Sequence, residues 1–288
     1  MKGKNKMKLP FKIDLSDKVA VVTGGGGVLC SGFAKAIAQC GARVAILDLR
    51  EENAKKVADE INADGGKALG ISANVLEKDS LTAAKKIINE KFGTVDILIN
   101  GAGGNHPKGT TTKEYYEKGD EENADVVSFF DLDKSGVEFV FNLNFLGTLI
   151  PTQVFAPDLL DKKDAVILNV SSMNAFCPLT KIPAYSGAKA AVSNFTKWLA
   201  VHFSKTGIRV NAIAPGFFVT DQNRALLIDE NGNFTPRSQK ILNSTPMGRF
   251  GETEELTGTL LWLLSNGATF VNGVVVPVDG GFSAYSGV

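Results

Sequence analysis

The sequence predicts an α/β fold: a single-domain, Rossmann-type, doubly wound parallel sheet of about seven strands with helices on both faces. Two observations predict it. From residue 18 onward, short runs rich in Val and Ile alternate with longer segments of helical periodicity. Most of the short runs do not alternate apolar with polar residues, as is typical of parallel strands covered on both faces. No repeat or linker divides the 288 residues, so we expect an N-terminal tail at 1–15 and one domain at 16–288.

The predicted strands are the apolar runs, and helices fill the intervals between them. The strands are expected at residues 18–23, 43–48, 67–73, 95–100, 165–171, 208–214 and 273–279. Segments 51–64 and 81–91 have helical spacing with charged outer faces. Two polar, turn-rich segments, 104–135 and 216–250, follow the fourth and sixth strands. Because open α/β sheets bind ligands at the carboxyl ends of their strands, we expect both to be substrate-side loops.

The composition excludes several classes of protein. Lys+Arg and Asp+Glu both number 31, which gives no electrostatic basis for general nucleic-acid binding and leaves self-association plausible. No apolar run approaches the ~18 residues of a membrane-spanning helix, and no apolar stretch of a signal peptide follows the N-terminal lysines. The three cysteines, at positions 30, 40 and 177, suggest neither a metal site nor a disulfide framework. We therefore expect a cytoplasmic protein with reduced thiols and no bound metal.

A glycine-rich turn follows the first strand and is the first candidate for cofactor binding. Thr23 is followed by glycines at 24–27, and a helix is expected to begin near Val28. Such a turn lets backbone amides and a helix N-terminus approach a pyrophosphate, although it could be no more than a tight turn. Asp48 ends the second strand, where a carboxylate accepts bonds from ribose hydroxyls and repels a 2′-phosphate. This predicts NAD rather than NADP, unless Asp48 is only a surface aspartate, and the nearby Arg50 weakens the preference.

The candidate chemical centre is the pair Tyr185 and Lys189. Pro183 is expected to start their helix, and positions i and i+4 lie on one helical face. Bringing a phenol from a pKa near 10 towards 7 takes about 4 kcal/mol, and one cation about 4 Å away supplies about that at an effective dielectric of 20. A lone pair of this kind also occurs by chance on surface helices. Ser172 at the end of the fifth strand and Asn144 on the preceding helix make the pattern specific.

With these residues in place, the sequence resembles the short-chain dehydrogenase/reductase family from residue 16 to 282. The resemblance implies a seven-stranded sheet and a homotetramer. The family's glycine pattern TGxxxGxG matches at Thr23 and Gly24, but Val28 and Cys30 stand where its last two glycines usually fall.

The resemblance also assigns roles to individual residues. It implies a catalytic set in which Tyr185 exchanges the proton, Ser172 binds the substrate oxygen, Lys189 holds the nicotinamide ribose and lowers the Tyr185 pKa, and Asn144 holds a water. The cofactor-binding residues that follow from the resemblance and from the strand ends are Thr23, Gly24, Gly26, Gly27, Val28, Leu29, Asp48, Asn74, Val75, Asn100, Ala102, Gly103, Tyr185, Lys189, Pro215, Gly216, Val219 and Thr220.

Shorter runs, at 100–107, 171–176, 214–218 and 222–224, resemble the bacterial D-mannonate oxidoreductases of this family, also called fructuronate reductases. That likeness implies NADH-dependent reduction of D-fructuronate to D-mannonate. Candidate substrate residues are Asn105, His106, Asn174 and Arg224. Arg224 is the expected partner of the carboxylate, unless it is an exposed helix arginine, and His106 could instead cap a loop. The alternatives are another sugar-acid or polyol dehydrogenase, such as a gluconate dehydrogenase, and a non-catalytic NAD-binding sensor.

The helix that carries Tyr185 also indicates assembly. One apolar stripe is formed by residues 188, 192, 195 and 199, and residues 191, 198 and 202 extend it around the helix. A helix that is apolar on more than one side must bury more than one side. We therefore expect one face against the sheet and the other against a second subunit.

Overall fold

The computed structural model describes residues 13–160, 162–220 and 224–287. Within them lies a parallel seven-stranded sheet in the order β3-β2-β1-β4-β5-β6-β7. All seven predicted strands are confirmed, each with ends shifted by no more than about two residues, as is usual for boundaries. The strands are β1 Val19–Thr23, β2 Arg43–Asp48, β3 Lys67–Ser72, β4 Ile97–Asn100, β5 Val166–Val170, β6 Arg209–Pro215 and β7 Val275–Val278.

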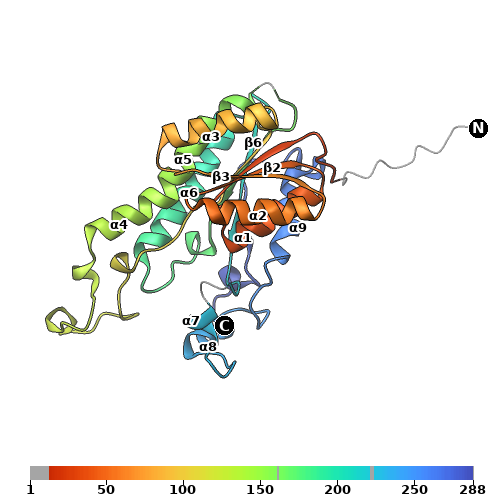
Figure 1. Cartoon of the computed structure of the whole chain (residues 1–288). Coiled ribbons are helices and arrows are strands. Elements are labelled where there is room, and N and C mark those ends of the chain that lie inside the picture. Colours follow the sequence, from red (N-terminus) through yellow and green to blue (C-terminus); the bar gives the residue numbers. More distant parts are fainter. Residues whose placement is uncertain (1–12, 161, 221–223, 288) are drawn as a thin grey trace, which may run out of the picture.

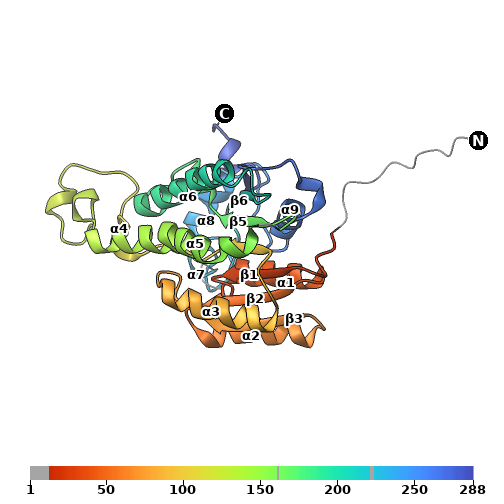
Figure 2. The ribbon, with the colours of Figure 1, turned by 90° about the horizontal axis from the view of Figure 1, so that it is seen from above.

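Helices cover both faces of the sheet, as predicted (Figures 1 and 2). One core lies between the sheet and α1, α2 and α9, and a second lies between the sheet and α3, α5 and α6. The helices are α1 Val28–Gln39, α2 Glu51–Ala63, α3 Lys78–Lys91, α4 Lys134–Phe141, α5 Gly147–Leu159, α6 Pro183–His202, α7 Arg224–Leu227, α8 Pro236–Asn243 and α9 Glu255–Leu264.

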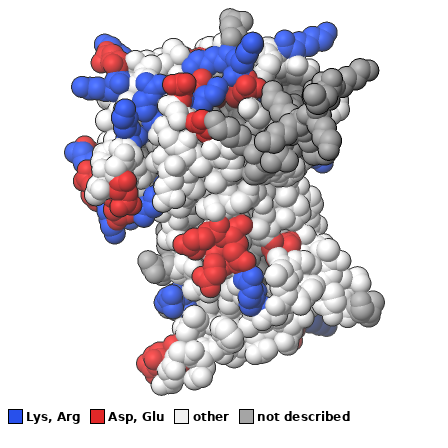
Figure 3. All heavy atoms as spheres, turned by 90° about the vertical axis from the view of Figure 1, so that its right-hand side faces the viewer, with Lys and Arg blue, Asp and Glu red and all other residues white. Residues whose placement is uncertain are grey.

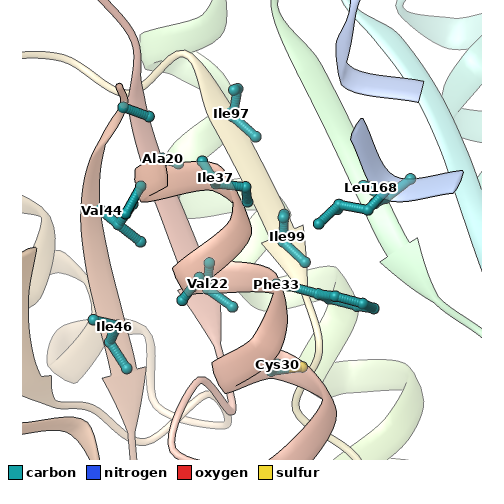
Figure 4. Close-up of a cluster of buried hydrophobic side chains, with 14 of the residues drawn as sticks. Ala20, Val22, Cys30, Phe33, Ile37, Val44, Ile46, Ile97, Ile99 and Leu168 are labelled. Carbon is teal, nitrogen blue, oxygen red and sulfur yellow. The ribbon is translucent and has the colours of Figure 1, made fainter. Parts of the chain in front are cut away.

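The first core shows why the strands are so apolar. Phe33 and Ile37 on α1 pack against the face of the sheet that carries Val22 on β1 and Ile99 on β4, and all four side chains are fully buried (Figure 4). A strand covered on both faces has no polar face, so β1 contributes buried side chains to both cores.

The strand order determines where a ligand-binding crevice can form in this sheet. After β3 at one edge, the polypeptide crosses back over β2 and β1 to begin β4 on the other side of β1. The connections that leave β1 and β4 therefore diverge to opposite faces, which opens a crevice at the carboxyl ends of these two strands. The glycine turn leaves β1, and residues 101–105 leave β4, at this crevice.

Two expectations about the chain are corrected. Of the tail predicted at 1–15, residues 1–12 lie outside the described residues. Leu15 is buried, and its amide donates to the Cys40 carbonyl at 2.8 Å, so the domain starts before residue 16.

The second correction concerns the length of the apolar segments. Helical residues run without a break over Lys134–Leu159, and by length and composition alone this run could span a membrane. Half of its apolar window is buried inside the protein, and it packs on α3 and α6, as a core helix does.

The two expected substrate-side loops contain local structure. Segment 104–135 holds the short turns Pro107–Gly109, Asp120–Glu122 and Phe129–Asp131 before α4 begins. We call residues 106–133 the arm, because with α4 it projects from the body in both views (Figures 1 and 2). Segment 216–250 contains α7 and α8.

Candidate active site

An open cleft of about 470 Å³ lies at the carboxyl ends of β1, β4, β5 and β6. It brings together residues that are far apart in the sequence. Those predicted for catalysis or binding that line it are Val28, Leu29, Gly103, Asn105, Ser172, Tyr185, Lys189, Pro215, Gly216 and Thr220. The cleft therefore joins the predicted cofactor half of the protein to the predicted chemical half.

The glycine turn brings the backbone at the end of β1 against the backbone at the end of β4. The Thr23 hydroxyl is buried and accepts bonds from the amides of Gly101 at 3.1 Å and Ala102 at 3.3 Å. Gly24 has φ of +62°, and a Cβ there would lie 2.8 Å from the Ala102 Cα atom. Only glycine satisfies both conditions, so Thr23, Gly24 and Ala102 shape the turn from beneath rather than lining the cleft.

Asp48 closes the same turn from β2. Its Oδ2 atom accepts from the Gly26 amide at 3.2 Å, and its Oδ1 atom accepts from the Arg50 amide at 3.0 Å. A Cβ on Gly26 would lie 2.8 Å from Asp48 Oδ2, so the turn passes directly over the carboxylate. Gly27 is the N-cap of α1 and supplies no side-chain cap, which leaves the first amides of that helix available beside Val28 and Leu29.

Cys30, which replaces a glycine of the family pattern, faces the protein interior. Its thiol is buried under α1 with Phe33 and Ile99 (Figure 4). A Cβ on Gly101 would lie only 2.2 Å from the Cys30 sulfur, so the thiol occupies the space that a side chain at 101 would need. Burial raises the pKa of this thiol to about 12, which keeps it neutral. The departure from the glycine pattern is thus accommodated by packing.

Lys189 and Tyr185 lie on one face of α6, as predicted from their spacing. Lys189 is only 4% exposed, and its ammonium donates to the Val170 carbonyl at 2.9 Å and lies 5.7 Å from the centre of the Tyr185 ring. Burial lowers the pKa of Lys189 from 10.5 to about 8. Ser172 stands at the end of β5, and its hydroxyl accepts from the Asn174 amide at 3.3 Å.

The acidity of Tyr185 differs from the expectation. Burial raises the pKa of the phenol above 10, and a hydrogen bond with Ser172 offsets this only in part. Lys189 does not offset the effect of burial, because its ammonium is directed to the Val170 carbonyl and lies 5.7 Å from the centre of the Tyr185 ring, farther than the 4 Å assumed for the pair. The protein alone therefore keeps Tyr185 protonated, the form needed to donate a proton.

Asn144 sits in a π-helical turn, Asn142–Leu146, that joins α4 to α5. Such bulges are frequent at functional sites, since they turn one residue out of the helical repeat. The Asn144 amide is fully buried, donates to the carbonyls of Val140 and Gly104 at 2.7 Å, and accepts from the Gly104 amide at 3.2 Å. A Cβ on Gly103 would lie 2.6 Å from Asn144 Oδ1 and 3.0 Å from Lys189 Nζ. Asn144 thus fixes the backbone beside Lys189.

Several predicted cofactor residues support the cleft without lining it. Asn100 is buried and donates to Thr152 and Asn169 at 3.0 and 2.9 Å, so it joins strands to helices. The Asn74 side chain bonds Glu77 and the Leu76 amide. The Val75 side chain packs against Gly147. The Val219 side chain packs against an apolar cluster.

The predicted substrate residues divide into one that faces the cleft and three that do not. Asn105 lines the cleft. His106 accepts from the Lys108 amide at 3.2 Å and packs on Phe139, so it caps a turn, which was the alternative role considered for it. Asn174 is buried beneath the turn after β5, and its Oδ1 atom has no hydrogen-bond partner among the described residues. Gln222 and Asn223 lie outside the described residues.

Arg224 is the clearest correction. It is exposed on α7 and does not line the cleft, whereas Arg237 on α8 does. The sequence places Arg224 nearer to β6, but α8 folds back so that its first turn reaches the cleft. The Thr235 amide donates to the Leu227 carbonyl at 3.1 Å, and the Ser238 hydroxyl bonds the same carbonyl. No sequence signal distinguishes Arg237 from other helix-start arginines.

The comparisons with known proteins agree with this geometry. The family model described as short chain dehydrogenase matches residues 18–231. The chain belongs to this family. An oxidoreductase of Haemophilus influenzae whose function is not characterised is 61% identical over 98% of this chain and 99% of its own length.

Solved structures of family members match over nearly the whole sequence. A crystal structure of a candidate D-mannonate oxidoreductase from Haemophilus influenzae, with bound NAD, is 62% identical, has a TM-score of 0.92 and covers 96% of this chain and 98% of its own. A gluconate 5-dehydrogenase from Burkholderia cenocepacia, in complex with NADP and tartrate, is 27% identical with a TM-score of 0.81, covering 95% of this chain and 98% of its own.

The residues present fit the nicotinamide dinucleotide that this family uses. Three features of the cleft form a cradle: the close backbone contact at Gly24, the uncapped start of α1, and the lack of a side chain at Gly103 beside Lys189. A helix N-terminus binds a pyrophosphate through its free amides. The chain is thus an oxidoreductase of the short-chain dehydrogenase family.

Proposed function

We propose that this short-chain dehydrogenase reduces D-fructuronate to D-mannonate with NADH, in a reversible reaction between a ketone and a secondary alcohol. One observation carries the oxidoreductase chemistry: Tyr185, Ser172 and Lys189 line one cleft with the start of α1. The choice of a sugar acid is supported by the 62% identical candidate D-mannonate oxidoreductase and by an arginine, Arg237, in the same cleft.

The residues divide the work of the reaction between them. Tyr185 donates its phenolic proton to the carbonyl oxygen during reduction and takes it back during oxidation. Ser172 holds that oxygen through a hydrogen bond and stabilises the charge that develops on it. The bound nicotinamide supplies or accepts the hydride. Lys189 supplies a positive charge beside the ribose position, and its pKa of about 8 lets it gain or lose a proton near neutral pH. Asn144 keeps Gly103 and Gly104 in place next to Lys189.

NAD is the proposed cofactor in preference to NADP, because Asp48 lies directly beneath the glycine turn. Its carboxylate bonds the Gly26 amide and stands where it would accept from ribose hydroxyls and repel a 2′-phosphate. The guanidinium of Arg50, which could offset this, bonds the side-chain oxygen of Asn53 once that amide is oriented to satisfy both groups.

Steady-state rates test the proposed function. The purified protein is assayed with fructuronate and NADH, and in reverse with NAD and mannonate, gluconate, mannitol or sorbitol. We expect mannonate to give the highest kcat/KM. Higher efficiency with gluconate would favour a gluconate dehydrogenase, the second candidate, for which the gluconate 5-dehydrogenase fold match is the specific support. Cofactor binding with no turnover of any of these substrates would favour the non-catalytic sensor.

A substitution at Tyr185 tests the chemistry itself. Tyr185→Phe removes the proton donor and is expected to lower kcat by about 10²- to 10⁴-fold while the protein still binds NADH. Tyr115→Phe, at an exposed position on the arm, is the matched control and should leave kcat unchanged. An unchanged rate for Tyr185→Phe would show that the catalytic assignment is wrong.

We further propose that the protein forms a homotetramer in the cytoplasm. On α6, one face is buried against the sheet, while Trp198 and Val201 on the other are 56% and 75% exposed. Phe270 and Val274, next to the edge strand β7, are also exposed. Figure 3, which views the side that carries α9, shows broad areas without charged side chains beside one acidic cluster. Sedimentation equilibrium measures the mass of the assembly, and a monomer would contradict this proposal.

The proposed cytoplasmic location is supported by the cysteines: those in the described residues are all free thiols, as is usual in a reducing compartment.

A further inference from the structure

A side chamber of about 270 Å³ adjoins the cleft and shares two of its lining residues, Phe217 and Arg237. Its walls come mainly from the segment before α6, helix α8 and the arm, with Phe217 after β6 and Phe282 near the C-terminus. Three cations face it, namely Lys181, Arg237 and Lys240, and one anion, Glu114. The chamber therefore extends the substrate end of the cleft into a cationic region.

The charges of the chamber do not balance. Lys240 bonds Glu114 at 2.8 Å, and this bond is the largest cause of the lowered pKa of the Glu114 carboxyl. Lys181 and Arg237 make smaller contributions to that shift. Neither forms an ion pair within 4 Å with any residue in the described part of the protein. Two positive charges are thus left without an anion in direct contact, and one of them, that of Arg237, lines the cleft that holds Tyr185.

The backbone of both cationic residues is fixed by local contacts. Arg237 lies in the first turn of α8, which is capped by Thr235 accepting from the Ser238 amide at 3.2 Å. Lys181 has φ of +72°, a left-handed conformation that costs a residue with a side chain about 1 kcal/mol. Its carbonyl accepts from the Thr111 amide at 2.9 Å, and it stands just before the helix that carries Tyr185. Strain of this kind persists where the surrounding structure imposes it, and it is common at ligand sites.

We propose that Arg237, assisted by Lys181, binds the carboxylate of the sugar acid and so selects acids over neutral polyols. This inference rests on the proposed function and names the residue that sets its substrate class. A guanidinium presents a planar pair of donors that matches the two oxygens of a carboxylate, and Lys181 adds a point charge on the same anion. In a hexonate the carboxylate is remote from C5, the carbon that a gluconate 5-dehydrogenase oxidises, and Arg237 lines both the chamber and the cleft that holds Tyr185 and Ser172.

Four variants test the proposal by kcat/KM for gluconate and mannonate against mannitol and sorbitol. Arg237→Ala is expected to lower kcat/KM for the better acid by about 10- to 100-fold, the usual loss for a charged hydrogen-bonded pair, with little change for polyols or for the KM of NAD. Arg237→Lys should recover only part of this loss. Lys181→Gly removes the ammonium and also relieves the left-handed strain, so its smaller loss on acids cannot come from misfolding. Arg224→Ala is the matched control, because that arginine is exposed outside the cleft.

Tartrate binding, measured by calorimetry on the NAD complex, gives a readout that does not depend on turnover. Arg237→Ala should weaken it at least tenfold, and Arg224→Ala should not change it. The inference is overturned if Arg237→Ala and Arg224→Ala lower kcat/KM for the acids equally, or if Arg237→Ala lowers kcat/KM equally for acids and polyols. It is also overturned if tartrate binds all variants with the same affinity. The proposed function can fail separately: a wild type that oxidises gluconate but not mannonate would refute the named substrate, while the loss of gluconate activity in Arg237→Ala would still support the inference.

Discussion

The buried charge of Lys189 allows a quantitative test, because we expect it to lower the free energy of unfolding. Lys189 is 4% exposed, and burial lowers its pKa from 10.5 to about 8. Each pKa unit corresponds to about 1.4 kcal/mol, so holding the charge at pH 7 costs about 3 kcal/mol of folding free energy. Lys189→Met keeps the length of the side chain and removes the charge. It also leaves the Val170 carbonyl without its donor, which costs about 1 kcal/mol. We expect a net gain of about 2 kcal/mol at pH 7, with activity lost.

The dependence on pH gives the sign of the effect. Below pH 8 both the folded and the unfolded wild type hold the proton, and the full cost is present. Between pH 8 and 10.5 the folded state releases the proton while the unfolded state keeps it, so the wild type gains stability as pH rises. By pH 9.5 this gain is about 2 kcal/mol, and the advantage of Lys189→Met should vanish. The titration of the neighbouring Cys30 and Tyr185 does not affect this comparison between pH 7 and 9.5, because burial raises the pKa of Cys30 to about 12 and that of Tyr185 above 10.

Urea unfolding of the cofactor-free protein at pH 7 and pH 9.5 measures both quantities. Lys197→Met, two turns farther along α6 at an exposed position, is the control and should change stability little at either pH. If Lys189→Met is no more stable than Lys197→Met at pH 7, or if the difference between them does not shrink at pH 9.5, the reasoning about a buried charge is wrong.

Two further substitutions test the cofactor half. Gly103→Ala places a Cβ 2.6 Å from Asn144 Oδ1 and 3.0 Å from Lys189 Nζ. We expect this displacement to cost about 1.4 kcal/mol and to lower kcat/KM by at least about tenfold. Gly104→Ala is the control and should leave kcat/KM nearly unchanged, because the nearest atom outside the adjacent residues is 3.6 Å away. Equal effects of the two substitutions on kcat/KM would contradict this account. Asp48→Asn removes the charge that opposes a 2′-phosphate, so the ratio of NADPH to NADH efficiency should rise by about tenfold, and an unchanged ratio would show that this carboxylate does not discriminate.

Periodicity was sufficient to predict the fold. The seven strands, their parallel arrangement and the coverage of both faces all follow from short apolar runs that alternate with helical segments, because burial on both faces leaves a strand no polar positions. Spacing was sufficient for the centre of the site. Tyr185 and Lys189 share a helical face whatever surrounds them, and Ser172 ends a strand, where ligands of open sheets bind.

The substrate end was not predictable in the same way. Arg224 and Arg237 both follow β6, and only the fold of α8 against α7 decides which guanidinium reaches the cleft. His106 has the chemistry of a ligand, but its ring nitrogen is used to cap a turn. The acidity of Tyr185 was misjudged for a related reason: the distance and direction of the Lys189 ammonium depend on the Val170 carbonyl, which belongs to β5, a strand remote in sequence.

By itself, the sequence determined the architecture, and it predicted that Tyr185, Lys189 and Ser172 meet in one cleft with the start of α1. These depend on short continuous apolar runs, on helical repeats of 3.6 residues and on the ends of strands, which neighbouring residues specify. The tertiary structure alone decided which arginine lines the cleft, which polar residues support the site from beneath, and in which direction burial shifts the pKa values of Tyr185 and Lys189. Those properties arise from contacts between segments distant in the sequence, and local spacing carries no information about them.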